Sequence, residues 1–232
     1  MELTELGEAA KKGDIKSVKQ LITGGADINE SLKNGSTPLI YAAQGDHSRV
    51  VTYLVEQGAD VNGTNKMGGT ALNRAVQNGN LEMVTFLLNN GAKVGDMALI
   101  MAAREGRIDI ANLLVEHGAN INAKQRWGHT ALMVAAKEGQ NGMIRYLLEQ
   151  GANILVEDKN GDTALDIATD NDQMETAAIL RQAGARKKNR VKKAASTLDD
   201  DDDEAESSED NELDELIGDD DEIPDDIDLD ED

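Results

Sequence analysis

The sequence contains no cysteine and few aromatic residues. Without cysteine the chain cannot form disulfides or bind zinc or iron–sulfur clusters through thiolates. Aromatic residues make up 2% of the 232 residues, so we do not expect a core built around large rings. The longest mostly apolar run, Met97 to Ala103, is far shorter than the ~20 residues that a membrane-spanning helix needs. The N-terminal residues lack the basic and apolar regions of a signal peptide, which predicts an intracellular protein.

The charge is divided unevenly along the chain. There are 23 Lys and Arg against 45 Asp and Glu, a formal net charge of −22. Residues 199–232 hold 22 of the acids and no base, whereas residues 186–193 hold six bases in eight positions. We therefore predict a folded domain over residues 1–185, a basic linker over 186–198 and a disordered acidic tail over 199–232.

The same pattern recurs along the predicted domain, which indicates a repeat architecture. The dipeptide Gly-Ala begins at Gly25, Gly58, Gly91, Gly118, Gly151 and Gly184, in steps of 33 residues with one step of 27. A second motif, Thr-Pro-Leu or Thr-Ala-Leu, follows the same steps from Thr37, Thr70, Thr130 and Thr163, with Met97-Ala98-Leu99 in the fourth copy. Small residues such as the pair Ala42-Ala43 would let neighbouring helices approach closely.

Each copy predicts two short helices joined by a turn. The threonine of the second motif precedes an apolar run and can cap a helix start. The next helix carries apolar residues at helical spacing, for example Val50, Val51 and Leu54. The glycine of each Gly-Ala is expected to adopt a left-handed conformation just past that helix. We expect the asparagines that follow, Asn29, Asn62 and Asn122, to bond the backbone of their own turns.

These residues carry a family resemblance. The run from Asn34 to Ala43 (Asn-Gly-Ser-Thr-Pro-Leu-Ile-Tyr-Ala-Ala), followed by Leu54 to Asn62, closely resembles the ankyrin repeat. Six copies cover roughly residues 3–185. The resemblance implies an all-α solenoid of stacked helix-turn-helix units with short β-hairpin fingers. Its first and last copies resemble polar terminal caps, which predicts a monomer. The histidine that usually follows Thr-Pro-Leu is absent; Ile40, Asn73, Ile100, Met133 and Asp166 stand in its place.

The fourth copy is six residues shorter than the others. The loss falls between Val94 and Gly95, where the family has its finger. We therefore expect this repeat to stack normally but to lack a finger. Two interpretations remain open: a tolerated loop deletion, or a notch in the binding face that accommodates part of a partner.

The resemblance also implies a protein-binding scaffold that uses its fingers and the concave ends of its first helices. The corresponding positions here are Lys33, Asn34, Ser36, Lys66, Met67, Arg104, Arg126, Trp127, His129, Lys137, Lys159 and Asn160. One finger position holds Lys33, Lys66, Arg126 and Lys159, and we expect Arg104 and Lys137 on the same side. Together these bases are either a functional basic ladder along the concave edge or a set of ordinary exposed side chains. Trp127 is either an interface hot spot or a ring packed on the neighbouring finger.

The function that these features favour is a non-catalytic adaptor with a regulating or solubilising tail. The alternative is an acidic-tailed chaperone or escort for a basic client, such as a histone or ribosomal protein. We predict no enzyme activity, cofactor or metal, because His47, His117 and His129 have no spacing that pairs them with a nucleophile or another ligand. The sequence does not distinguish a eukaryotic protein from a bacterial effector secreted into host cells.

The basic and acidic segments leave further alternatives. Residues 186–193 are either a nuclear import signal or a solvated helix extension, which places the protein in the cytoplasm or the nucleus. A nucleic acid partner is disfavoured, because the adjacent tail would repel phosphates. The tail is a solubilising brush, a binding site for a basic protein, a competitor for the chain's own fingers or an aid to rapid association. Ser196, Thr197 and Ser207 each precede an acid by three positions, the context of acidophilic kinases.

Overall fold

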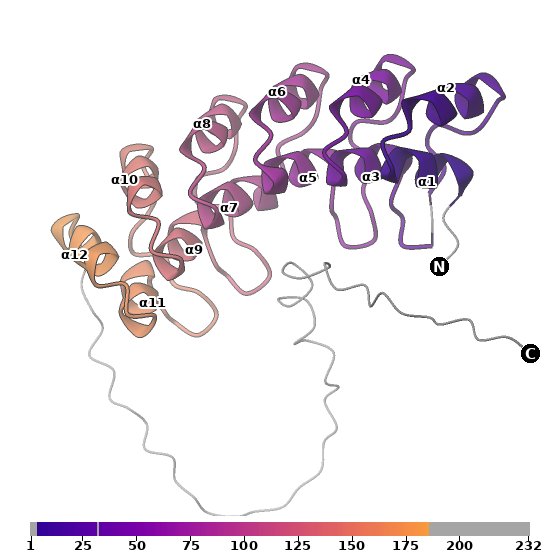
Figure 1. The fold of residues 1–232 in the computed structure, drawn as a ribbon. Coiled ribbons are helices and arrows are strands. Elements are labelled where there is room, and N and C mark those ends of the chain that lie inside the picture. Colours follow the sequence, from indigo (N-terminus) through magenta and orange to yellow (C-terminus); the bar gives the residue numbers. More distant parts are fainter. Residues whose placement is uncertain (1–3, 32, 186–232) are drawn as a thin grey trace, which may run out of the picture. The chain divides into compact units, whose positions relative to one another are not determined.

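The computed structural model describes residues 4–31 and 33–185. The predicted linker (186–198) and tail (199–232) lie outside the described residues. Within the described part, helices follow one another in pairs, and the pairs stack side by side in chain order (Figure 1). The pairs are α1 (Glu5–Lys11) with α2 (Ile15–Thr23), α3 (Pro38–Gln44) with α4 (Ser48–Glu56), α5 (Ala71–Asn78) with α6 (Leu81–Asn89), α7 (Asp96–Arg104) with α8 (Ile108–Glu116), α9 (Ala131–Lys137) with α10 (Asn141–Glu149), and α11 (Ala164–Asp170) with α12 (Met174–Gln182).

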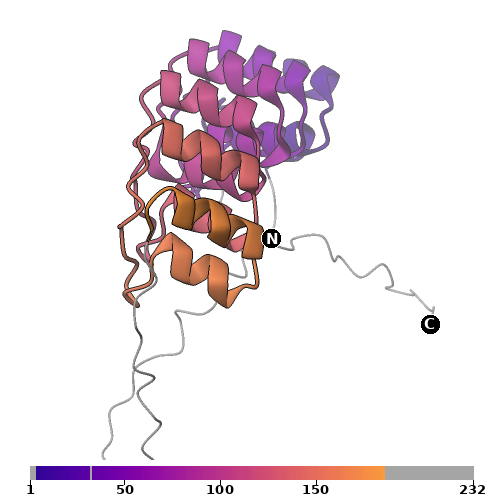
Figure 2. The ribbon, with the colours of Figure 1, turned by 90° about the vertical axis from the view of Figure 1, so that its left-hand side faces the viewer.

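The pairs form two layers, and the long connections leave from one side of the stack. The first helix of each pair lies in an inner layer and the second in an outer layer (Figure 1). Seen along the stack from its α12 end, the finger loops lie along one edge (Figure 2). The prediction of an all-α solenoid of six helix pairs is confirmed.

The predicted caps form at the starts of the inner helices. The Thr70 hydroxyl accepts a hydrogen bond from the Asn73 amide at 3.1 Å, and Thr37, Thr130 and Thr163 cap their helices in the same way. In the last repeat Asp166, at the position of the usual histidine, accepts bonds from the Thr163 amide at 3.1 Å and hydroxyl at 2.7 Å. The Asp166 carboxylate therefore fixes the threonine at the start of its own helix.

The core consists of small and medium aliphatic side chains. The paired alanines of α3, α7 and α9 are fully buried where neighbouring inner helices meet. Leucines and isoleucines from every repeat join them in one continuous cluster. The chain has few large aromatic side chains to bury, and stacking the repeats buries enough aliphatic surface in their place.

The prediction for the asparagines after Gly-Ala was wrong. Asn29 accepts a bond from the amide of Asp60 in the next repeat at 2.8 Å, and Asn122 bonds Asn153 in the same way. Asn62 makes two such bonds, one from the Lys93 amide at 2.8 Å and one to the Gly91 carbonyl at 3.0 Å. The turns themselves are bonded by the acceptor two positions earlier, as Asp60 bonds the Asn62 amide. These asparagines therefore link consecutive repeats.

The fingers are tight loops rather than paired strands. Across residues 4–31 and 33–185 no β-strand is formed. The third finger is closed by one backbone bond, from the Asn65 amide to the Gly69 carbonyl at 3.0 Å. The fifth and sixth are closed alike, by Gln125 with His129 and by Asp158 with Asp162. These fingers therefore have the shape of hairpins, but the expected β-strands do not form in them.

On the inter-helix turns, side chains reach back to the preceding repeat. His47, at the start of α4, lies with its Nε2 2.8 Å from the Lys11 carbonyl oxygen. Gln140, at the start of α10, donates to the Arg104 carbonyl at 3.0 Å. The Arg107 guanidinium covers the left-handed Gly79 (φ 69°). This edge of the stack is therefore held by side chains of one repeat lying on the turn of another.

Candidate partner-binding surface

The fingers present the predicted basic side chains, but the structure divides them into two pairs. Lys33, Lys66, Arg126 and Lys159 are all exposed. The Lys66 amide donates to the Asn34 carbonyl at 2.9 Å, which joins the second and third fingers. The Lys159 amide donates to the Trp127 carbonyl at 3.1 Å, which joins the fifth and sixth. Between these pairs lies the repeat without a finger.

Trp127 lies close to two cations. The guanidinium carbon of Arg126 is 5.9 Å from the ring, and the ammonium of Lys159 on the next finger is 5.4 Å away. Both distances fall within the range of a cation–π interaction. The ring is half-buried. It therefore packs against the neighbouring finger and also keeps exposed surface.

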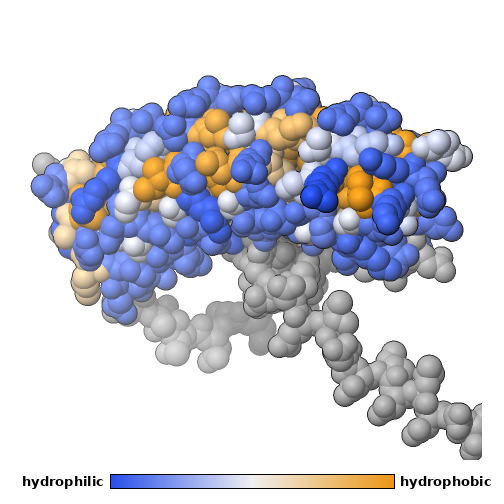
Figure 3. Space-filling view, turned by 45° about the horizontal axis from the view of Figure 1, so that its top comes forward, coloured by the Kyte–Doolittle hydropathy of each residue, from blue (hydrophilic) through white to orange (hydrophobic). Residues whose placement is uncertain are grey.

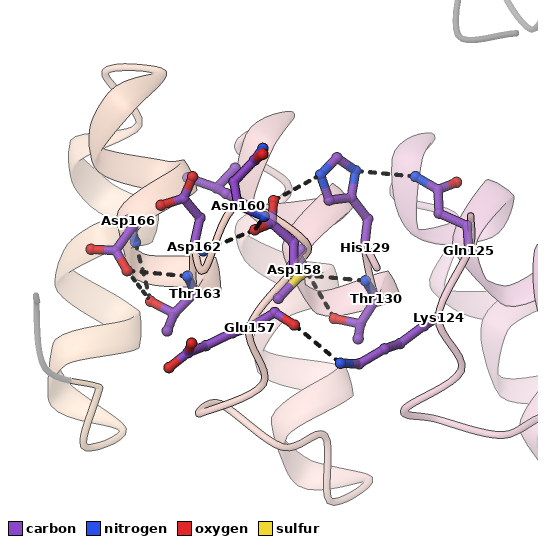
Figure 4. Close-up of polar contacts among 12 residues, drawn as sticks. Lys124, Gln125, His129, Thr130, Glu157, Asp158, Asn160, Asp162, Thr163 and Asp166 are labelled. Carbon is purple, nitrogen blue, oxygen red and sulfur yellow. Dashed lines mark hydrogen bonds and ion pairs between the residues drawn. The ribbon is translucent and has the colours of Figure 1, made fainter. Parts of the chain in front are cut away.

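His129 connects the same two fingers through its side chain, which contacts Asp158 on the sixth finger and Gln125 on its own (Figure 4). Its Nε2 is 3.2 Å from the Asp158 carboxylate, and its Nδ1 is 3.1 Å from the side-chain nitrogen of Gln125. Because an amide nitrogen donates, these contacts assign the ring proton to Nε2, which then donates to Asp158. His129 thus helps to position the finger loops, in addition to its place among the predicted contacts.

Asp158 holds the sixth finger in shape and was not among the predicted residues. One carboxylate oxygen accepts bonds from the amides of Asn160 and Asp162, each at 2.8 Å. Asn65 does the same in the third finger, bonding Met67 at 3.0 Å and Gly69 at 2.7 Å. An Asp or Asn at the second position of a finger is the sequence signal that identifies this support. The exposed Asn160 sits on a loop fixed in this way.

Some predicted contacts lie elsewhere. Ser36 is buried (4% exposed), and Asn34 is engaged with the Tyr41 hydroxyl, to which its side chain donates at 3.2 Å. Arg104 and Lys137 are the last residues of α7 and α9. The fingers join the opposite ends of the inner helices, so the structure does not bring these two bases into the finger ladder.

The outer layer shows a different character. Figure 3 looks obliquely onto this side, where hydrophobic side chains gather in patches separated by hydrophilic ones. The helix starts contribute Leu81, Ile108 and Met174, which are 38%, 39% and 64% exposed. Among the described residues no helix has the length and apolarity to cross a bilayer, and no group of His, Asp and Glu is arranged to hold a metal.

Comparisons with known proteins agree with this architecture. The family described as "Ankyrin repeats (3 copies)" matches residues 6–98 and again residues 99–191. Myotrophin from Xenopus laevis is 49% identical over 35 residues, which are 15% of this chain and 30% of the frog protein.

Two solved structures share the fold. One is a chain from the complex of the Bdellovibrio bacteriovorus predatory endopeptidase Bd0816 with the immunity protein Bd3460. It superposes with a TM-score of 0.72 at 31% identity, over 78% of this chain and 99% of that one. The other is the ankyrin-repeat domain of human ASB11, with a TM-score of 0.71 at 29% identity, over 81% of this chain and 87% of that one.

Proposed function

The chain belongs to the ankyrin-repeat family, and we propose that it is a non-catalytic adaptor that binds another protein through its fingers and inner helices. Ankyrin-repeat domains are generally protein-binding modules and typically non-catalytic. The Bdellovibrio chain of similar fold comes from a complex of two proteins. The observation that carries the proposal for this chain is that Trp127 contacts both Arg126 and Lys159, on two fingers joined by a backbone hydrogen bond.

The geometry of Trp127 suits an interface anchor. Trp and Arg are the side chains most often found to dominate binding energy at interfaces. The two cations near the ring help to fix it before a partner arrives, so binding costs less side-chain entropy. The loops beneath are rigid because Asp158 and His129 bond them from within. A partner would therefore meet a prepared surface.

The test compares two aromatic residues in the full-length chain. The full-length chain captures proteins from a lysate of its source, and the affinity of the purified captured protein is then measured by titration calorimetry. Trp127→Ala should weaken binding at least about tenfold, the scale of a hot-spot residue. Tyr146→Ala on the outer helix α10, also half-buried, is the matched control and should bind normally. Equal affinities for all three chains would remove the finger face as the binding surface.

The second candidate is an escort for a basic client. It is favoured by the 22 acids among residues 199–232, which would attract a basic protein over long range. Truncation to residues 1–198 separates the candidates. An adaptor keeps or gains affinity for its partner after truncation. An escort loses most of its affinity for basic clients, and its intact form shows a steep decline in affinity with added salt.

A further inference from the structure

The fourth repeat leaves a vacant finger position. The chain runs from α6 to α7 through residues 90–95, whereas the corresponding connections with fingers span residues 24–37, 57–70, 117–130 and 150–163. In Figure 1 finger loops descend beside the other inner helices, and none descends between α6 and α7. The position lies between the third finger (residues 64–69) and the fifth finger (residues 124–129).

A backbone acceptor borders the vacant position. In both bonded pairs the next finger donates a backbone amide to one carbonyl, that of Asn34 or Trp127. The equivalent residue of the third finger is Met67, one step of 33 residues after Asn34. Within the described residues no backbone hydrogen bond reaches the Met67 carbonyl. An extended peptide can bond such an edge as an added strand does.

Methionine side chains line the same position. Met97 and Met101 lie four residues apart on α7, which places them on one face of the helix. Met97 replaces the capping threonine, and Met101 replaces a residue that elsewhere lies under a finger, such as Tyr41 (8% exposed). Both methionines are half-buried, and Met67 on the third finger is 57% exposed. Methionine adapts its shape to apolar ligands of different form.

The charges on the third-finger side are positive. Residues 31–36 and 64–69 contain Lys33 and Lys66 and no acid. Arg74 on α5 is the counterpart of Met101 one repeat earlier. It donates to Gln77 at 3.0 Å, and its buried Nε has no acceptor among the described residues. Asp96, exposed at the start of α7, is the nearby acid on the other side.

We propose that the vacant finger position receives an extended acidic segment of a partner protein. The proposal rests on the protein-binding function above and specifies the partner. An amide of the segment bonds the Met67 carbonyl, and a large apolar side chain of the segment packs on Met97 and Met101. Acidic residues of the segment face Lys66 and Arg74, because Asp96 would repel them on the α7 side. The partner segment thus takes the place of the finger that the fourth repeat lacks.

The central test restores the finger. A copy of residues 64–69 is inserted between Val94 and Gly95 of the full-length chain. A display library of random peptides of about twelve residues is then selected on the unmodified full-length chain. The selected peptides should share a large apolar residue flanked by Asp or Glu. The finger-restored variant should bind them at least about thirtyfold more weakly, because its own loop fills the position.

Single substitutions test the same site if the inserted finger prevents folding. Met101→Glu places a charge on the apolar surface, and Lys66→Glu reverses the charge of the third finger. Each should weaken the selected peptides about tenfold or more. Lys16→Glu makes the same charge change on the outer helix α2 and should leave affinity unchanged. Circular dichroism checks that each variant is folded, and the fluorescence of Trp127, the only Trp, follows binding.

Each remaining result contradicts a defined part of the proposal. If the finger-restored variant binds the peptides normally while Trp127→Ala does not, the protein-binding face stands and the vacant position is not the site. If neither change weakens binding, the proposed function fails as well. Selected peptides without acids overturn the charge argument. Selected peptides that bind residues 1–198 at least about tenfold more tightly than the full-length chain would assign the position to the chain's own tail.

Discussion

Single asparagine side chains act at the residue scale as links between repeats. The expectation of a local turn bond failed for Asn62 because its partners, Gly91 and Lys93, lie about thirty residues ahead. The residues of one turn do not reveal which backbone groups of the next repeat will lie beside that turn. The acceptors that close the turns locally, such as Asp60, follow the ordinary rule for Asx turns.

Removing the Asn62 side chain should loosen the junction between the third and fourth repeats. Asn62→Ala loses two hydrogen bonds to the next repeat, so we expect the free energy of unfolding to fall by about 1–2 kcal/mol. Asn89→Ala, at the exposed end of α6, serves as the control and should change stability little. Urea unfolding followed by circular dichroism measures both. Equal stability of the two variants would show that the Asn62 hydrogen bonds add nothing to the free energy of unfolding.

Asp14 gives the N-terminal repeat an acid-sensitive cap. The Ser17 hydroxyl donates to its carboxylate at 2.6 Å, and the Ser17 and Lys16 amides donate at 3.2 and 3.1 Å. These bonds lower the pKa of Asp14 from its ordinary value of 3.8. A carboxyl whose pKa is lowered by folding stabilises the native state above about pH 4, and that stability is lost as the pH falls below its folded pKa.

Asp14→Asn should therefore change the acid dependence of stability. The amide keeps a hydrogen-bond acceptor for the cap but does not titrate. We expect the midpoint of thermal unfolding to decline less steeply in the variant than in the natural chain between about pH 4 and about pH 2. Thermal unfolding at a series of pH values measures the two slopes. Parallel curves would mean that the cap contributes nothing to acid unfolding.

The helices and their caps are the elements that the sequence predicts well. Each depends on residues close together in the chain, such as Thr70 before Ala71 and the left-handed glycine that begins each Gly-Ala. The fingers are different, because their shape is local but their contacts are not. The cations around Trp127 come from its own finger and from the next one. The sequence identifies Trp127 as a candidate, and only stacking shows what surrounds it.

Gly79, on the turn between α5 and α6, and Gly25, just past the end of α2, provide a matched pair of glycines for an element-scale prediction. Gly79 and Gly25 both have left-handed backbones, with φ of 69° and 92°. A Cβ added to Gly25 meets nothing, whereas one added to Gly79 collides with the Arg107 guanidinium. Both alanine variants lose about 1 kcal/mol or more from the left-handed backbone. Gly79→Ala should lose more, because Arg107 must also leave its place on the turn.

Chemical unfolding of the two alanine variants measures this difference. If Gly79→Ala and Gly25→Ala are equally destabilised, the Arg107 contact does not support the turn. The variant Arg107→Ala should then behave like the natural chain. A larger loss for Gly79→Ala would instead show that the contact between Arg107 and the turn at Gly79 contributes to the free energy of unfolding.

On the scale of the whole molecule, stability should be passed from repeat to neighbouring repeat. Each helix pair packs against the pairs beside it, so a central defect affects two junctions and a terminal defect affects one. Leu99 and Leu165 hold equivalent positions in the fourth and sixth repeats and are 1% and 0% exposed. Truncation of either leucine leaves a cavity costing about 2–5 kcal/mol.

The two leucines should nevertheless give different unfolding behaviour. Leu165→Ala should release α11 and α12 locally while the other repeats stay protected from hydrogen exchange. Leu99→Ala should lower protection on both sides of α7 and broaden the transition. Amide exchange followed by mass spectrometry distinguishes these patterns. Uniform loss of protection in both variants would show that the stack unfolds as one unit.

The charge of the molecule also has to be considered by segment. Residues 1–185 hold 17 bases and 23 acids, and the remaining residues supply six bases and 22 acids, so most of the net charge of −22 comes from the tail. The pH and salt responses of the intact chain therefore combine two sources. Comparing residues 1–198 with the full chain separates the acid response of the stack from that of the tail.

The vacant finger position has a mechanical consequence. Bonds between fingers act as struts along one edge of the stack, from Asn34 to Lys66 and from Trp127 to Lys159. The fourth repeat lacks such a strut and is joined to the third by the Asn62 link. Under a pulling or bending load, we expect the stack to bend at the junction between the third and fourth repeats, while the repeats on either side move as rigid units. A ligand bound at the vacant finger position would bridge this junction and so increase the bending stiffness of the whole stack.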